Sequence, residues 1–201
     1  TTSGCYLELT GGTQVPLFAT SASTSGFKAT GAFDVPLNGT VDITADFDVR
    51  KSLVKRGVLE SYVLKPTIRL VVNDQAGGLN VSLIGAESYD MLVVYAYEDD
   101  LYVATEADEP ALETDDPQFF GAVTSAAEGS GGTYPLRFLA AGTYDLVVVA
   151  YDAAGAFVEV VGLHQDAVVV EDTNSTVNVD LATIPAAPTE SVGSVVLSLT
   201  D

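Results

Sequence analysis

The sequence predicts an all-β protein with two β-sandwich domains, of the immunoglobulin or transthyretin-like kind, plus a detached C-terminal strand. Apolar and polar residues alternate along many short segments, and Gly-containing turns separate these segments at intervals of about 8–12 residues. No amphipathic helical period extends beyond about two turns. With 201 residues, of which 47% are hydrophobic, the chain can bury one large core or two small ones.

The clearest predicted strand is Thr40–Val49, where every second side chain from Val41 onward is apolar and the intervening ones are Asp or Thr. Such alternation is typical of a half-buried strand. Similar runs predict strands at Cys5–Thr10, Phe27–Pro36, Tyr62–Val72, Leu79–Ile84, Met91–Glu98, Gly142–Asp152, Phe157–Val161, Ala167–Val170 and Thr176–Leu181. One short helical segment is expected at Arg50–Arg56, and Cys5, the only cysteine, is expected to be a small buried strand residue.

The C-terminal residues differ from the rest of the pattern. A linker at 185–191, containing Pro185 and Pro188, precedes a half-apolar run at 192–201. A strand of this kind cannot stand alone in water, because one face must be buried and its backbone groups must be paired. We therefore expect it to be a donor strand whose apolar side chains form a subunit interface, namely Val192, Val195, Val196, Leu197 and Leu199.

Charge divides the chain near residue 73. Residues 1–72 hold seven Lys and Arg against six Asp and Glu, whereas residues 73–201 hold one Arg against 22 acids. We therefore expect domain boundaries at 1–72 and 73–184. The total charge of -20 disfavours nucleic acid as a partner, because a field of this sign repels phosphate backbones. No run approaches the 18 or so apolar residues that a membrane-spanning helix needs, so no membrane insertion is expected.

Two motifs in the first segment suggest a relationship. D-F-D-V-R-K-S-L-V (Asp46–Val54) and S-Y-V-L-K-P-T-I-R-L-V (Ser61–Val71) resemble an uncharacterised family of exported bacterial β-proteins, whose members carry D-F-D-x-x-K-S followed by Y-x-L-K-P-x-x-R. The preceding Gly12–Lys28 is similar to the same family's approach to that signature. The resemblance covers about residues 5–72 and implies an extracellular or cell-surface location.

The second segment resembles another kind of domain. Residues 79–184 are similar to a carboxypeptidase regulatory-like (transthyretin-like) sandwich, on the basis of A-A-G-T-Y-D-L-V-V-V-A-Y-D (Ala140–Asp152) and T-V-N-V-D-L (Thr176–Leu181). This resemblance implies a non-catalytic sandwich module.

The order of strands departs from the exported family's pattern. That family's domain opens with a strand resembling G-x-x-x-V-S-L-T-D, and here the pattern stands at Gly193–Asp201. The strand could fold back into its own first domain, or fill that place in another copy by β-strand addition. A third possibility is that the chain is part of a longer tandem protein.

Catalytic motifs are scarce. Ser25-x-x-Lys28 and Ser52-x-x-Lys55 match one nucleophile pattern without its companion motifs, and His164 is the only histidine. The sequence therefore predicts a protein that is not an enzyme and needs no cofactor. Ca²⁺ is the exception left open, because the acidic segment from Glu98 to Asp116 offers oxygen ligands. This segment contains Pro110 and no basic residue, so we expect it to be a long exposed loop with a short edge strand at Leu101–Ala104. The candidate ligands are Glu98, Asp99, Asp100, Asp115 and Asp116.

These observations lead to two functional hypotheses. The first is an extracellular structural subunit that polymerises with further copies of itself, head to tail, by donating residues 192–201 into the domain of residues 1–72. The alternative is a cell-surface adhesion module that binds glycans or Ca²⁺ through the acidic segment 98–116.

Overall fold

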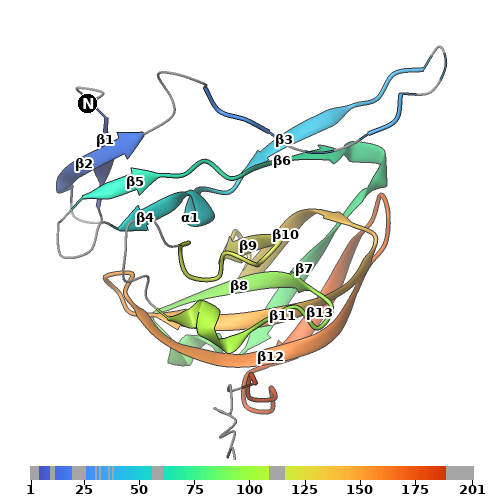
Figure 1. The fold of residues 1–201 in the computed structure, drawn as a ribbon. Coiled ribbons are helices and arrows are strands. Elements are labelled where there is room, and N and C mark those ends of the chain that lie inside the picture. The colour runs from blue at the N-terminus through green and yellow to red at the C-terminus, as the bar shows by residue number, and fades with distance from the viewer. Residues whose placement is uncertain are drawn as a thin grey trace, which may run out of the picture.

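A computed structural model describes most of the chain (Figure 1). The described residues are 5–9, 12–19, 26–29, 31, 33–35, 37, 39–55, 61–108 and 116–188. Their regular structure is almost entirely β-strand, which confirms the predicted all-β class. The predicted donor strand at 192–201 lies outside the described residues.

The elements fall into two groups along the chain. Those up to residue 72 are β1 (Tyr6–Glu8), β2 (Gln14–Ala19), β3 (Ile43–Phe47), α1 (Val49–Ser52), β4 (Leu53–Lys55), β5 (Tyr62–Leu64) and β6 (Ile68–Val72). Those after it are η1 (Asn73–Gln75), β7 (Ala76–Ile84), η2 (Ala86–Ser88), β8 (Met91–Glu98), η3 (Ala104–Ala107), β9 (Thr124–Ala127), β10 (Thr133–Ala140), β11 (Gly142–Tyr151), β12 (Phe157–Val169) and β13 (Asn174–Asp180).

The strands from β7 onward form a sandwich of two sheets. One sheet has the order β10-β7-β13 and the other the order β12-β11-β8-β9. Side chains between the sheets form the main core, in which Leu79, Val81, Leu136 and Leu146 have no exposed surface. β13 pairs with β7 in parallel, and the other pairs in both sheets are antiparallel.

β8 is buried on both faces, from Leu92 to Tyr97. Because side chains alternate along a strand, the even-numbered ones enter the main core and the odd-numbered ones face outward. There a second core forms, where Phe119 stacks on Tyr95 with ring centroids 4.5 Å apart. This double burial explains why β8 is an apolar run rather than an alternating one.

The second core corrects the expectation that residues 98–116 form an exposed loop with an edge strand at 101–104. The described part of this segment turns back over the outer face of β8, with residues 101–103 in coil and the single turn η3 after them. Tyr102 is only 8% exposed because its ring packs against Tyr97. Glu106 holds the segment down by accepting hydrogen bonds from the Tyr97 hydroxyl and the Gly121 backbone N–H.

Residues 5–72, which we call the 5–72 module, form a layer above the sandwich in the view of Figure 1. Its strands pair in the order β1-β2-β5-β4 and, separately, β3-β6. β3 and β4 form one arm of a long hairpin that α1 interrupts, and β5 and β6 form the returning arm. The module holds three of the 28 fully buried apolar residues among those described, so it has almost no core of its own.

Several local predictions for this module were wrong. The described residues between 26 and 35 form no strand and are exposed, and Cys5 is exposed rather than buried. The helical segment expected at Arg50–Arg56 is a single turn that begins one residue earlier and ends at Ser52. Asp48 caps this turn by accepting a hydrogen bond from the Lys51 backbone N–H at 3.1 Å.

Four strands were missed from the sequence, and one of them, β4, lies in the segment expected to be helical. β2 and β10 contain Pro16 and Pro135, and proline argues against a strand unless it lies at an edge or a bulge. β10 is indeed an edge strand, and so is β9, whose short T-S-A-A sequence has little strand propensity.

Candidate assembly interface

The hairpin formed by β3 and β6 turns its apolar side away from the sandwich. Opposite residues pair in register, with Ala45 facing Leu70 and Asp46 facing Arg69. Because side chains alternate, one face carries only apolar residues and the other carries the polar pair. We call the apolar side the open face; its residues are Ile43, Ala45, Phe47, Ile68, Leu70 and Val72.

The alternation in β3 predicts that its apolar side chains are buried and its polar ones exposed, and the structure shows the reverse. Thr44 and Asp46 are half-buried because they face the sandwich, whereas Ala45 and Phe47 count as exposed, Phe47 with 37% of its surface accessible. Nothing among the described residues forms a second sheet over the open face. The hairpin therefore presents a half-covered apolar surface to its surroundings.

A thin layer of chain covers part of the open face. Phe27 approaches Phe47 with ring centroids 6.3 Å apart, and Gly31 lies so close to Leu70 that a β-carbon added there would be 2.8 Å from the Leu70 Cβ. This layer is itself apolar and exposed: Phe33 is 44% accessible and Val35 is 60% accessible. It therefore extends the apolar surface instead of closing it.

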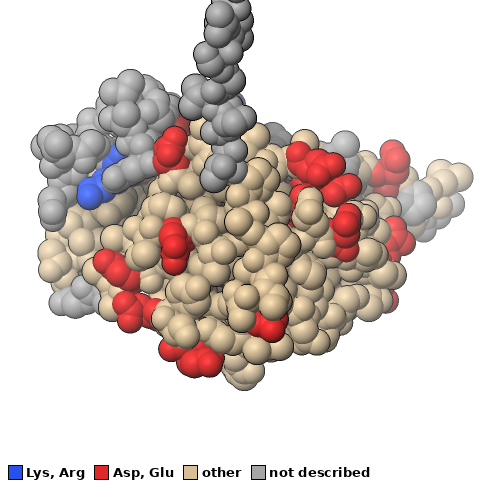
Figure 2. Space-filling model, turned by 90° about the horizontal axis from the view of Figure 1, so that it is seen from below, with Lys and Arg blue, Asp and Glu red and all other residues tan. Residues whose placement is uncertain are grey.

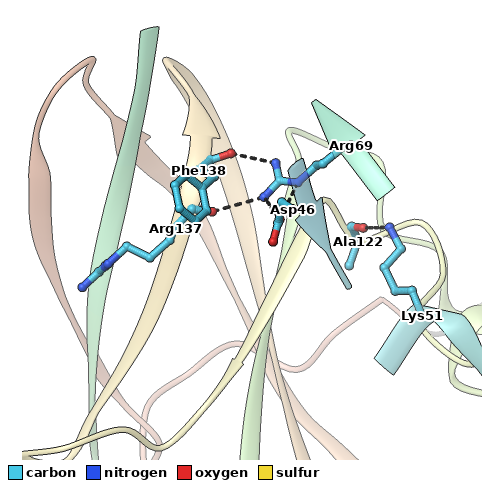
Figure 3. A network of polar contacts seen from close by, with 6 residues as sticks. All are labelled: Asp46, Lys51, Arg69, Ala122, Arg137 and Phe138. Atoms are coloured by element: carbon cyan, nitrogen blue, oxygen red, sulfur yellow. Dashed lines mark hydrogen bonds and ion pairs between the residues drawn. The ribbon is translucent and has the colours of Figure 1, made fainter. Parts of the chain in front are cut away.

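The polar side of the hairpin is fixed to the sandwich by Arg69 (Figure 3). Its Nε donates to Asp46 Oδ2 at 2.9 Å, its Nη1 to the Phe138 carbonyl at 2.7 Å, and its Nη2 to the Arg137 carbonyl at 3.2 Å. Both carbonyls lie in a bulge of β10, where the pairing with β7 shifts and Phe138 has φ 58°. A bulge leaves backbone groups unpaired, and here the guanidinium supplies two donors.

Lys51 is a second anchor between the module and the sandwich. Its side chain is largely buried, its Nζ donates to the Ala122 carbonyl, and it lies 5.3 Å from the centroid of the Phe120 ring. Burial lowers the pKa of Lys51, and the nearby Asp48 only partly opposes that effect. With Arg69, this contact fixes the orientation of the hairpin, so that the open face points outward.

Carboxylates meet at the far end of β8, where the Ca²⁺ ligands were predicted. Asp99 and Asp100 lie there with Asp145, all three with carboxylate oxygens within 4.8 Å of one another. Of the other predicted ligands, Glu98 and Asp116 are not in this group, and Asp115 lies outside the described residues. Partial loss of solvent, and then repulsion from neighbouring carboxylates, raise the pKa of Asp99.

Asp145 was missed by the sequence analysis and is the buried member of this group, with 1% of its surface accessible. Its two oxygens accept hydrogen bonds from the backbone N–H groups of Asp100, at 3.1 Å, and Asp166, at 3.3 Å. Both donors have positive φ: Asp100 lies in the turn after β8 and Asp166 lies in a bulge of β12, so Asp145 holds a turn and a bulge in place. An acid within the buried run D-L-V-V-V was the signal that could have revealed it.

One face of the molecule is sparsely acidic. On the face seen in Figure 2, carboxylates are scattered over the sandwich and Lys or Arg shows only at one edge. No helix among the described residues is long and apolar enough to cross a membrane.

Of the residues considered for a catalytic site, Ser52 serves the backbone instead. Ser52 has no exposed surface; its Oγ donates to the Asp48 carbonyl at 2.5 Å and accepts from the Thr67 backbone N–H at 2.9 Å. His164 lies within β12 opposite Leu146, and Ser25 lies outside the described residues. Fold and site together describe an all-β protein whose distinctive feature is an incompletely covered module.

Residues 2–66 match a family described as a domain of unknown function (DUF4382). No curated protein matches the sequence. A solved structure with similarity is GBS52, the minor pilin of the Gram-positive pathogen Streptococcus agalactiae, with 17% identity and a TM-score of 0.31 over 67% of this chain. The chain spans about half of that pilin, 52% of its length.

Proposed function

We propose that this protein is a non-enzymatic, extracellular structural subunit that joins copies head to tail by strand donation. Residues 192–201 of one copy would complete the 5–72 module of the next. The open face carries this proposal, because it is an apolar sheet surface held outward by Arg69 and Lys51 and, within the described part of the chain, left without a second sheet. A contact that uses different surfaces on the two copies, and does not close, gives a fibre.

The chemistry of residues 192–201 suits this role. Val195, Leu197 and Leu199 alternate with mostly small or polar residues, so a strand there has one apolar side. Burying a Val or Leu side chain fully contributes about 1.5–3 kcal/mol. Three such side chains against the open face, with backbone pairing to a strand edge, could offset the cost of ordering the segment.

Deletion of residues 186–201 tests the proposal. We expect filaments of the full chain in electron micrographs and monomers of the deletion variant, and we expect a peptide of residues 190–201 to bind that variant in calorimetry. A peptide carrying Leu197→Asp and Leu199→Asp is the matched control and should not bind. A full chain that stays monomeric at high concentration would refute head-to-tail assembly, and unchanged filaments of the deletion variant would refute the role of this strand.

The glycan- or Ca²⁺-binding alternative has one observation in its favour, the three clustered carboxylates at the end of β8. Against it, Ca²⁺ needs six to eight oxygens, and the oxygens of Asp145 already accept two backbone N–H groups. Calorimetry with Ca²⁺ and a glycan array decide between the functions: binding without assembly would favour the adhesion module.

A further inference from the structure

An open groove of about 750 Å³ lies between the 5–72 module and one end of the sandwich. The module contributes β4, Arg50 and Tyr62; the sandwich contributes the beginning of β8 and the turn between β11 and β12. Its sandwich wall is largely aromatic and apolar, including Val93, Tyr151 and Phe157. A concave apolar surface of this size accommodates a short segment of another chain.

The charge of this groove is unusual for the molecule. Arg50 and Lys55 both line it, in a chain with only eight Lys and Arg, and Asp108 is the one carboxylate among the described lining residues. Neither cation makes a hydrogen bond or ion pair with another described residue. Beside Arg50, the hydroxyls of Tyr95 and Tyr151 bond to each other at 2.7 Å, so one O–H remains free to donate. The groove thus combines apolar walls with donors for a carboxylate.

The turn at the opposite end of β8 carries acidic and apolar side chains, which complement the basic and apolar groove. The turn that follows it exposes Asp99 and Asp100, and next to them Leu101 has 58% of its surface accessible. β8 begins in the groove at Met91 and ends at this turn. At about 3.4 Å per residue, the length of the strand separates the groove from the turn by roughly 25 Å. An acidic turn with an apolar tip therefore stands at one end of the molecule and a basic, apolar groove at the other.

We propose that the 99–101 turn of one copy docks into the groove of a second copy, with Leu101 against the apolar wall and the two carboxylates near Arg50 and Lys55. The contact goes beyond strand donation, because it uses neither the open face nor residues 192–201. It is small and therefore weak between free copies, and linkage of the copies by strand donation would raise its occupancy.

Disulfide trapping between two singly substituted full-length chains tests this contact, in a Cys5→Ser background. One chain carries Leu101→Cys and the other Lys55→Cys, so the mixed disulfide can form only between copies. Val168→Cys is the matched control for the first chain, since Val168 is also 58% accessible but lies on β12. We expect the 101–55 disulfide to form about tenfold faster than the 168–55 disulfide at low salt, and 0.5 M NaCl to remove most of that difference.

Equal rates for the two pairs would overturn the contact. Adding Leu197→Asp to both chains separates this inference from strand donation: filaments should disappear while the preference for the 101–55 disulfide remains. If Leu197→Asp abolishes the filaments but the 101–55 disulfide forms no faster than the 168–55 disulfide, strand donation is supported and only the groove contact is refuted. Replacing Asp99 by Lys in the Leu101→Cys chain should lower its rate to that of the control, and an unchanged rate would refute the role of charge.

Discussion

Arg69 is the residue on which the orientation of the hairpin depends most, and Arg69→Met is the perturbation that tests it. Methionine keeps much of the apolar stem but removes every donor. The change leaves the Asp46 carboxylate without its cation and the carbonyls of Arg137 and Phe138 without a protein partner. The 5–72 module should then loosen from the sandwich while the sandwich itself stays folded.

The expected magnitude follows from three hydrogen bonds. A bond to a charged group contributes about 1.5–3 kcal/mol when buried, but the Arg69 and Asp46 side chains retain 26% and 24% of their accessible surface. Discounting for solvent screening to about 1 kcal/mol each gives a loss of about 3 kcal/mol. At about 4–8 °C per kcal/mol for a unit of 60–100 residues, the melting transition of the module should fall by about 12–24 °C, while that of the sandwich stays near its wild-type value.

Calorimetry and hydrogen exchange measure this loss. Lys28→Met is the matched control, because Lys28 is exposed and makes no hydrogen bond or ion pair with another described residue. Arg69→Lys should fall between wild type and Arg69→Met, since an ammonium keeps the charge but cannot make the forked contact. Amides of β3 and β6 should lose protection in Arg69→Met while those of β8 and β11 keep it. A module transition of Arg69→Met within about 2 °C of the control would refute the anchoring role, because about 0.5 kcal/mol is the ordinary scatter of surface substitutions.

Three further changes test other parts of the structure. Asp145→Ala should lower Tm by about 5–10 °C, because the turn at Asp100 and the bulge at Asp166 lose their acceptor, and a melting curve unchanged from wild type would contradict that role. Burial lowers the pKa of Lys51, so the folded state holds fewer protons than the unfolded one between that pKa and 10.5. Wild type should therefore gain stability relative to Lys51→Met as pH rises through this window in urea titrations; a constant difference would contradict the burial. Leu197→Asp should weaken filament assembly by about 30-fold or more, measured as the critical concentration, since it removes about 2 kcal/mol of burial; an unchanged critical concentration would exclude this side chain from the interface.

The strands of the sandwich were largely predictable because their sequences carry strong local signals. β8 and β11 are long runs of β-branched and aromatic residues between turn residues, and both strands lie where the sequence placed them. The predicted strands Phe157–Val161 and Ala167–Val170 proved to be two parts of β12, which continues through a register shift near Gly162. A bulge of this kind depends on the neighbouring strand and leaves no local pattern.

The orientation of the hairpin in the 5–72 module could not be predicted from the sequence. Alternation in β3 correctly separated its apolar side from its polar side. It could not reveal which side faces the sandwich, because that choice is made by Arg69 and Lys51, which reach carbonyls about 70 residues away in sequence. Asp99 and Asp100 were recognised as a pair, but Asp145 and the groove residues converge only through tertiary structure.

The confinement of both cores to residues after 78 has a consequence for how the protein acquires its structure. The sandwich contains both hydrophobic cores and can therefore fold without residues 5–72. The 5–72 module is synthesised first but buries little apolar surface by folding before the sandwich is present. The 5–72 module would then fold last and be the first part to open. The hydrogen-exchange protection of its amides would depend on what covers the module. The module and the sandwich would thus fold in the reverse of their order along the chain. Until its module has folded, an isolated copy would be exposed to misassociation.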